Sequence, residues 1–215
     1  MKTLDLKKEL KNLYLPSAKK VEILRVPPLQ FAMIDGAMEE GQGPSSSANF
    51  QDAIQAMYGI AYTLKFMLKK RKKNPVDYPV MALEGLWWVE NGIFDITVKD
   101  NWLYTLMILQ PSVVTPESFE AARGEVRRKR GDSPALGQLR LAKFEEGWCM
   151  QVMHIGPYAT EPATVERMKA FAEENGFRDC VGRGGKHHEI YLGDPRKADP
   201  AKLKTVLRHP AERIR

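Results

Sequence analysis

A glutamate stands near the end of the chain where a buried strand would normally carry an aliphatic residue. Residues 187–192 read His-His-Glu-Ile-Tyr-Leu, with Glu189 in the middle. Side chains alternate between the two faces of a strand, so the aliphatic residues would face a core while Glu189 shares the other face with His187 and Tyr191. A charge is costly to bury without a partner. A carboxylate beside a phenol therefore indicates a ligand pocket in which Glu189 and Tyr191 could take part in acid–base chemistry.

Glu84 is a second carboxylate in an apolar setting. It lies in residues 81–88, which read Met-Ala-Leu-Glu-Gly-Leu-Trp-Trp. Two interpretations stay open. Glu84 is either a rim carboxylate or the partner of a lysine, or it is a second pocket acid that faces Glu189 across a cleft. In the latter case one acid would serve as general base and the other as proton donor, provided that their surroundings separate the two pKa values.

Aromatic residues accompany both glutamates. Five of them fall on strands that would border the same cleft: Trp87, Trp88, Trp102, Tyr104 and Tyr191. Ring faces give a flat ligand a stacking surface and attract positive charge. Tyr104 could also donate a proton, and Tyr158 is expected at the mouth of the cleft. Aromatic residues that alternate with aliphatic ones are equally typical of a core, and for Trp102 both interpretations stay open. Tyr58 and Tyr62 could either close the pocket or fill the core, and we expect them to fill the core.

The two histidines before Glu189 do not predict a metal site. Adjacent strand residues point to opposite faces, so His187 and His188 cannot easily both join Glu189 in one ligand set. No cysteine or acid cluster completes such a set. Neither Cys149 nor Cys180 has an identifiable base partner, which argues against a thiol nucleophile. We therefore expect no metal and no cofactor, and His187 stays a candidate ligand contact.

These residues must be positioned by elements that recur in the same order in each half of the chain. In the first half, residues 20–36 predict a strand that is interrupted at Pro27-Pro28. Apolar residues at helical spacing from 50 to 68 predict an amphipathic helix. Two further strands are expected, at 79–90 and 101–110. The first half is thus strand-helix-strand-strand.

A helix and a linker separate the halves. Thr115 is a good N-cap, Pro116 suits the first helical position, and the helix is expected to end near Arg130. Residues 131–134, Gly-Asp-Ser-Pro, then read as the linker between the two halves.

The second half repeats the order. A strand is expected over 139–156 with a turn at 145–147, then a helix over 160–175, then strands at 186–192 and 204–209. We therefore predict one α+β domain over residues 1–215. In it, tandem strand-helix-strand-strand repeats, about 20–110 and 139–209, form an antiparallel sheet with helices on one side and a ligand cleft between the repeats.

Composition narrows the functional class. The chain has 215 residues, 43% hydrophobic and 28% charged, as expected of a folded soluble protein. It has no apolar run of 18 residues and no signal-peptide pattern, and its two cysteines suggest a reduced, cytoplasmic setting. The net charge of +6 comes largely from basic runs at 69–73 and 127–130, which suit solvated helix C-termini. Without a nucleic-acid-binding motif, we expect no direct nucleic-acid binding.

Three segments carry a resemblance to a known family. Residues 102–111, 153–158 and 187–195 look like those of the GyrI-like small-molecule-binding domain proteins, and the likeness runs from about Lys20 to His209. It is greatest to the stand-alone members, which lack the DNA-binding domain of drug-sensing regulators. The resemblance implies the tandem-repeat fold, a cleft that binds flat aromatic or cationic compounds, and an acid at the pocket floor.

Some stand-alone members of this family hydrolyse the cyclopropane ring of DNA-alkylating cyclopropanoid compounds and so protect the cell. The resemblance therefore implies the same hydrolysis here, with Glu189 and Glu84 as the acids. It matches Glu84 less closely than Glu189. The alternative is a binder that sequesters aromatic or cationic compounds without turnover. A weaker option is a protein partner of a topoisomerase or regulator. A hydrophobic aromatic small molecule is the expected ligand, and the protein is expected to be a monomer or a homodimer.

Overall fold

A computed structural model describes residues 1–92, 94–98 and 101–214. Its main sheet has the strand order β2-β8-β11-β10-β5-β6-β3-β7, with β9 paired to β11, and every pairing in it is antiparallel. The first half of the chain supplies β2 (Glu22–Val26), β3 (Leu29–Ala37), β5 (Leu83–Trp88) and β6 (Leu103–Leu109). The second half supplies β7 (Arg140–Phe144), β8 (Gly147–Ile155), β9 (Phe177–Asp179), β10 (His187–Tyr191) and β11 (Lys204–Arg213).

The sheet order reads the same from both edges, as two related repeats require. In each repeat the strand before the helix (β3 or β8) lies next to the last strand (β6 or β11), on the side nearer the sheet edge. The two middle strands, β5 and β10, meet at the centre. Moreover, β2 pairs with β8 of the second repeat while β7 pairs with β3 of the first, so each repeat contributes the edge strand of the other repeat's half of the sheet. The predicted α+β class with its antiparallel sheet is confirmed.

The helices form where the sequence supplies caps and apolar stripes. In α3 (Ala48–Lys69) the Ser47 side chain accepts the backbone N–H of Phe50, and α4 (Pro116–Arg130) begins with a capping box between Thr115 and Ser118. The remaining helices are α1 (Leu6–Glu9), α2 (Lys11–Tyr14), α5 (Pro134–Gln138) and α6 (Glu161–Glu174), with 3-10 turns at Tyr158–Thr160 and Pro200–Lys202. A two-stranded pair joins β1 (Lys2–Thr3) to β4 (Val76–Asp77).

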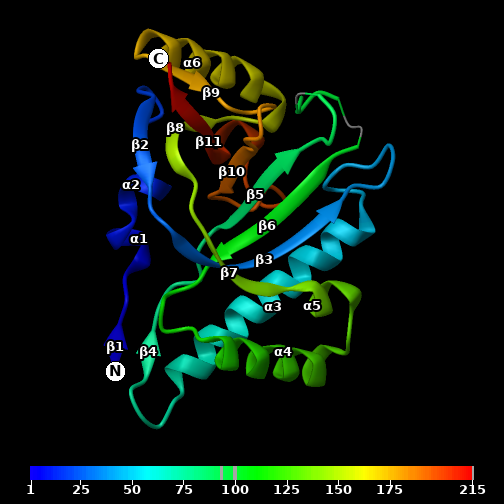
Figure 1. The fold of residues 1–215 in the computed structure, drawn as a ribbon. Coiled ribbons are helices and arrows are strands. Elements are labelled where there is room, and N and C mark those ends of the chain that lie inside the picture. The colour runs from blue at the N-terminus through cyan, green and yellow to red at the C-terminus, as the bar shows by residue number, and fades with distance from the viewer. Residues whose placement is uncertain (93, 99–100, 215) are drawn as a thin grey trace.

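The long helices cover one side of the sheet. Figure 1 shows α3, α4 and α5 gathered over one half and α6 with β9 over the other. The stripe of α3 that includes Met57, Ile60 and Leu64 is buried in the larger core, while Met168 and Ala172 of α6 belong to a smaller core. The predicted placement of the helices on one side is confirmed. Within the described residues, no helix combines the length and apolar character that crossing a membrane requires.

The opposite side of the sheet is covered by the N-terminal segment, through a buried polar cluster. The Tyr14 hydroxyl donates to Glu84 Oε1 over 2.5 Å, and His188 Nε2 lies 3.1 Å from Glu84 Oε2. His188 Nδ1 lies 2.9 Å from Glu146 Oε1, and Arg208 donates to the backbone oxygen of Leu13. Burial opposes a charge on His188, but the carboxylates of Glu146 and Glu84 outweigh it and raise the pKa of His188 to about 9. A charged His188 thus forms ion pairs with both Glu84 and Glu146.

This cluster corrects the expected place of Glu84. In the β5–β10 register Glu189 lies opposite Gly85, and Glu84 lies opposite Ile190. Directly opposed residues share a face, so Glu84 and Glu189 point to opposite sides of the sheet. Glu84 is fully buried and paired with Tyr14 and His188, and it does not face Glu189 across a cleft. Sequence alternation identified the neighbours of Glu84 within its strand, but not which face the helices would cover.

Tyr14→Phe is expected to destabilise the protein by about 1–3 kcal/mol, because it leaves a buried carboxyl oxygen of Glu84 without its hydrogen-bond donor. Urea denaturation followed by circular dichroism at neutral pH measures the change in free energy of unfolding. The matched control is Tyr62→Phe, at a tyrosine that is 48% exposed on α3 and should change stability little. Equal effects of the two substitutions would contradict a stabilising role for the Tyr14–Glu84 bond.

Candidate functional site

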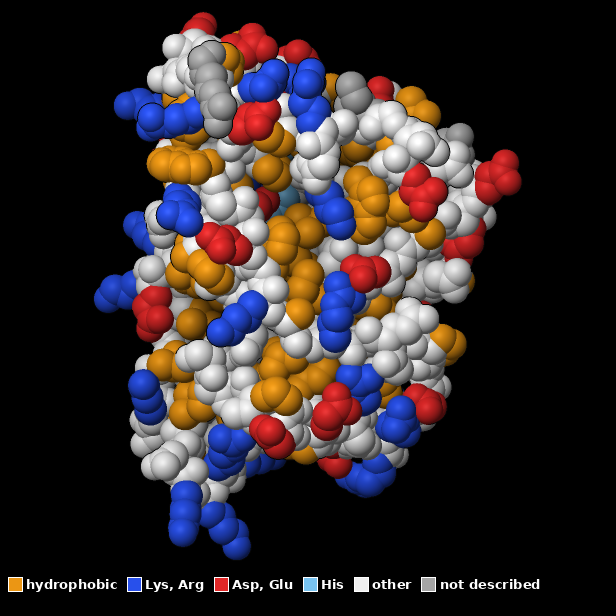
Figure 2. Space-filling model, in the orientation of Figure 1, with side chains coloured by type: hydrophobic (Ala, Val, Ile, Leu, Met, Phe, Trp, Pro, Cys, Tyr) orange, Lys and Arg blue, Asp and Glu red, His pale blue; other side chains and the backbone are white. Residues whose placement is uncertain are grey.

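A cavity of about 470 Å³ lies on the helix-covered side of the sheet. The second repeat lines most of it through α6, β9 and the start of β10, and the first repeat contributes the loop between β5 and β6. Phe94 closes one wall, Glu161 and Val165 of α6 another, and His187 with His209 form part of the sheet side. Figure 2 shows histidine surface at the floor of a recess in the upper half of that view, between hydrophobic side chains. Residues of both repeats therefore meet at this cavity.

Glu189 lies directly behind the cavity wall. Its Oε1 is 2.9 Å from His187 Nε2, and its side chain is almost fully buried. Burial alone would raise the pKa of Glu189, but the hydrogen bond and positive charge of His187 and the contact with the Tyr191 hydroxyl hold it below the usual value. Tyr191 in turn has its pKa raised by burial and by the charge of Glu189. Glu189 is thus the ionised acid of this site.

Glu161 is its neutral counterpart. It occupies the first position of α6 and is 0% exposed, and neither carboxyl oxygen has a hydrogen-bond partner among the described residues. Donor atoms of Glu161, His187 and Glu189 all lie within 4.8 Å of one another. Burial and the nearby charge of Glu189 raise the pKa of Glu161 to about 10. At neutral pH the two acids therefore differ by one proton, which a general acid and a general base require.

A glycine makes room for this arrangement. Gly85 lies opposite Glu189 in the register, and the indole Nε1 of Trp87 donates to the Tyr191 hydroxyl over 2.9 Å. A Cβ at position 85 would lie 2.7 Å from Trp87 Nε1 and 3.0 Å from the Tyr191 oxygen. Any larger residue there would push apart the two side chains that border Glu189.

Aromatic rings enclose the acids on the side of the first repeat. Phe94 stacks on His187 with ring centroids 5.2 Å apart and on Trp87 at 6.5 Å. Trp102 packs against both Phe94 and Trp87, at 5.1 and 5.7 Å. Phe94 thus lies on the cavity wall, and Trp87 and Trp102 lie behind it. A planar group in the cavity would therefore meet the ring of Phe94, which the two tryptophans support from behind.

The structure brings only some of the predicted site residues together. His187, Glu189, Tyr191, Trp87 and Trp102 lie in or next to the cavity wall. The ring of Tyr158 meets that of Tyr191 edge-on at 6.1 Å, so this tyrosine is adjacent too. Their roles stay predictions.

Three predicted residues lie elsewhere. Glu84 and Trp88 are on the opposite side of the sheet, where Lys186 Nζ lies 3.2 Å from the centre of the Trp88 ring. The placement of Trp88 in the same cleft as Trp87 is therefore wrong, because adjacent strand residues face opposite ways. Tyr104 shares the helix-covered side but lies one strand further from β10, opposite Trp87 and against Phe50.

Four side chains escaped the sequence analysis: Phe94, Glu161, Asp179 and His209. Glu161 follows Thr160 at a helix start, where an acid is ordinary because it complements the helix dipole. His209 lies on the same strand face as Leu207, and only strand register places it beside His187. Nothing in their local sequence marks them, so pairing and helix docking alone reveal them.

A single divalent cation could span the same three donor groups of Glu161, His187 and Glu189. Two observations favour a bound proton rather than a metal ion among these three groups. His187 Nε2, the nitrogen a metal would need, already bonds Glu189, and the raised pKa of Glu161 makes it a neutral acid. The predicted absence of a metal stays a prediction.

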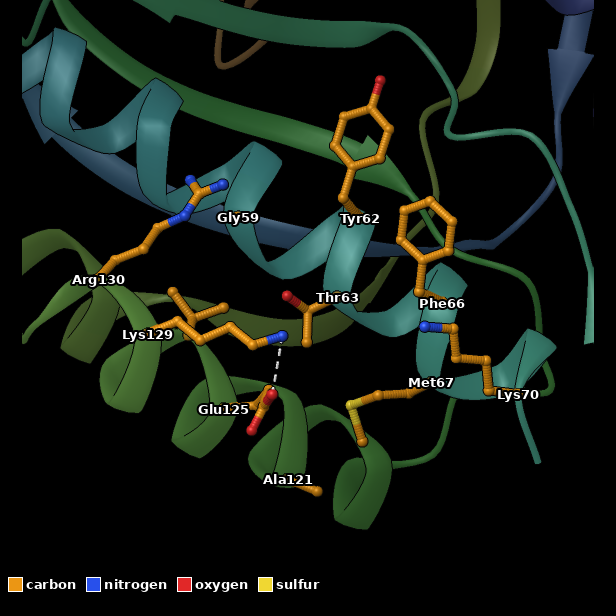
Figure 3. Close-up of a pocket in the computed structure, with 11 residues that line it drawn as sticks. Gly59, Tyr62, Thr63, Phe66, Met67, Lys70, Ala121, Glu125, Lys129 and Arg130 are labelled. Carbon is orange, nitrogen blue, oxygen red and sulfur yellow. Dashed lines mark ion pairs between the residues drawn. The ribbon is translucent and has the colours of Figure 1, made fainter. Parts of the chain in front are cut away.

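A second hollow, of about 560 Å³, lies far from these acids between α3 and α4. Figure 3 shows Tyr62 and Phe66 projecting from α3 on one side and the Lys129–Glu125 ion pair of α4 on the other. Tyr62 is 48% exposed, so its expected place in the core is wrong. Among the described residues that line this hollow, none form an acid–base pair comparable with that of Glu161 and Glu189.

Glu161→Gln tests the neutral state of Glu161. An unfolded glutamate ionises near pH 4.3, whereas the folded-state pKa is about 10, so folding retains a proton and wild-type stability falls as the pH rises between these values. The variant has no such proton and should be more stable than wild type, by a margin that grows by up to about 1.4 kcal/mol per pH unit. Urea denaturation at several pH values measures it.

Glu174→Gln, at an exposed position of the same helix, is the control and should show no such growth with pH. A constant difference between Glu161→Gln and wild type would mean that Glu161 is ionised in the folded protein.

Comparisons with known proteins agree with this architecture. Residues 19–211 match the family model of the GyrI-like small molecule binding domain. The chain is 40% identical to a hydrolase from Listeria innocua, with a TM-score of 0.81 over 97% of this chain and 100% of that one. A further hydrolase from Listeria innocua is 42% identical, with a TM-score of 0.84 over 98% and 100% of the two chains.

The C-terminal domain of EcmrR shares the fold alone, at 12% identity and a TM-score of 0.51 over 91% of this chain and 98% of that domain. Among curated proteins, none matches the chain. Because the family model spans most of its length, the chain belongs to the GyrI-like small-molecule-binding domain family.

Proposed function

We propose that this protein is a hydrolase that binds a hydrophobic, planar small molecule and opens a strained cyclopropane ring in it. One observation carries the proposal. Two buried carboxyls that differ by a proton, Glu189 and Glu161, lie within 4.8 Å of each other beside an aromatic-walled cavity. Likeness to hydrolases at 40% and 42% identity supports the reaction class, and the resemblance of the sequence to cyclopropanoid hydrolases supports the substrate class.

The chemistry assigns one role to each acid. In a cyclopropane conjugated to a dienone, the oxygen of water attacks a ring carbon and the carbon–carbon bond breaks. The electron pair moves into the dienone and leaves a phenolate as the ring becomes aromatic. Glu189 takes the proton from the attacking water, and Glu161 gives its proton to the phenolate oxygen. The product is a single ring-opened molecule that carries both a phenol and an alcohol, and transfer of a proton from Glu189 to Glu161 restores the starting state.

The surroundings suit such a substrate. Phe94 supplies the ring face on the cavity wall, and Trp87 and Trp102 pack behind it. Tyr191, which borders Glu189 and is held by Trp87, could donate a second hydrogen bond to the developing oxyanion. Tyr158, beside Tyr191, would lie at the edge of the ligand. Acid–base help of roughly 10²–10⁴-fold would suffice, because ring strain supplies much of the driving force.

The second candidate is a binder that sequesters aromatic or cationic compounds without turnover. The same rings and the ionised Glu189 favour it, since a cation over an aromatic face gains roughly 0.5–2 kcal/mol. In either case we propose that the protein acts in the cytoplasm and protects the cell. The monomeric or dimeric state stays a prediction.

Multiple-turnover incubation with a cyclopropyl-dienone compound separates the two functions, with ring opening followed by absorbance and mass spectrometry. Wild type is expected to release product in large molar excess over protein. Glu189→Gln and Glu161→Gln should each lower kcat at least about 100-fold while still binding the compound, because both amides keep the shape but neither transfers the proton.

The control is Glu166→Gln, at a carboxylate on the cavity rim whose side chain is 71% exposed and paired with Lys169. It should leave kcat within about threefold of wild type, because an exposed pair contributes little. Glutamate-dependent binding without any turnover would favour the sequestering protein. The absence of both would contradict this ligand class.

A further inference from the structure

A chain of hydrogen bonds runs from Glu189 to the far wall of the cavity. His187 Nε2 is 2.9 Å from Glu189 Oε1, and His187 Nδ1 is 2.7 Å from His209 Nε2. His209 Nδ1 is 2.8 Å from Asp179 Oδ2, and Asp179 also accepts the backbone N–H of Val181. Three strands supply the members, namely β10, β11 and β9. Both histidines and Asp179 line the cavity, and both imidazoles are almost fully buried.

Counting hydrogens fixes the charge of this chain. Each end is a carboxylate that only accepts, so His187 Nε2 and His209 Nδ1 must both carry hydrogen. The bond between the two rings needs a third hydrogen, on either His187 or His209. Two neutral imidazoles carry only two such hydrogens between them. The pair therefore carries one positive charge while Glu189 and Asp179 are both ionised.

The surroundings limit the pair to a single charge. Burial lowers the pKa of His209 and opposes a cation there, as does the charge of His187, whereas the hydrogen bond to Asp179 favours it. The hydrogen bond from His209 holds the pKa of Asp179 below its usual value, although burial alone would raise it. Titratable and charged groups also line the cavity from α6, the β5–β6 loop, and β9 with its following loop: Glu161, Glu166, Lys169, Glu173, Asp95, Arg178 and Arg183. Glu189 and Tyr191 of β10 lie behind its wall.

We propose that His187, His209 and Asp179 are positioning residues that share one proton and hold Glu189 ionised and oriented beside Glu161. The Asp179 carboxylate accepts the hydrogen bond of His209 and balances the positive charge, so the extra proton stays on the imidazole pair and is not released to solvent. His187 keeps the tautomer that donates to Glu189, because its other nitrogen is fixed by His209. The kinetic consequence rests on the proposed hydrolysis, but the protonation of the pair does not.

The direct test is nitrogen-15 NMR of the histidine side chains without any ligand. Wild type is expected to show one imidazolium charge shared between His187 and His209 at pH 7, with ring hydrogens on both outer nitrogens. Asp179→Asn should remove the charge at a lower pH than in wild type, by about one unit or more, because the amide cannot balance it. Two neutral imidazoles in wild type at pH 7 would overturn the proposal, whether or not the protein is a hydrolase.

The kinetic test is the pH profile of kcat/KM for the cyclopropyl-dienone substrate. Without the cation, the pKa of Glu189 rises, so the acidic limb of the profile should move up by about one pH unit in Asp179→Asn. Asp179→Glu keeps the charge and should restore the wild-type profile in part. Glu212→Gln is the control, since Glu212 lies on β11 but is exposed and paired with Arg178.

A purely structural role for Asp179 would lower thermal stability and kcat without moving the acidic limb, and that result would overturn the kinetic part of the proposal. If Asp179→Asn does not fold, His209→Gln provides the same pH-profile comparison, and the wild-type NMR spectrum still decides the shared charge. A histidine titration that moves in Asp179→Asn, together with no turnover in wild type, would support the shared charge of the imidazole pair while contradicting the hydrolase.

Discussion

The pairing of β5 with β10 is the constraint on which the rest of the site depends. These strands come from different repeats, about a hundred residues apart in the chain, and they meet antiparallel at the centre of the sheet. Their register places Gly85 opposite Glu189 and so leaves room for the Trp87–Tyr191 hydrogen bond beside that acid. A shift of β10 by one residue against β5 would turn Glu189 toward the side of the sheet that Glu84 occupies, away from the helices.

The same two strands carry buried charged groups on both faces of the sheet, and the two faces differ in how these groups are paired. On the N-terminal side, Glu84, His188, Glu146 and Arg208 satisfy one another, as a buried network must if it is to stabilise a fold. On the helix-covered side, Glu189 is satisfied by His187, but Glu161 is left buried without a hydrogen-bond partner among the residues that the structure describes. An unpaired polar group costs stability, and such costs concentrate at functional sites. This asymmetry distinguishes the structural face from the candidate site.

Membership of the GyrI-like family explains the architecture, but not by itself the chemistry, because one fold can carry many functions. The proposed hydrolysis depends on the details of one cavity. A carboxyl that retains its proton lies near one that does not, and both side chains are almost fully buried. Water exclusion strengthens every interaction with a developing charge. A binder would need the rings and one acid, whereas the second, neutral acid is what a proton-transfer enzyme adds.

The sequence alone determined most elements of the two repeats and the membership of each strand face, but not the short elements α1, α2, α5, β1, β4 and β9. Periodicity located the strands and helices, Thr115 and Pro116 marked a helix start, and alternation placed His187 and Tyr191 with Glu189. Only the tertiary structure decided which face the helices cover, and so it separated Glu84 and Trp88 from the cavity. It also brought Glu161, His209 and Asp179 to Glu189 from α6, β11 and β9. The physical reason is that alternation is a local property of one strand, whereas register and helix docking depend on contacts between distant segments.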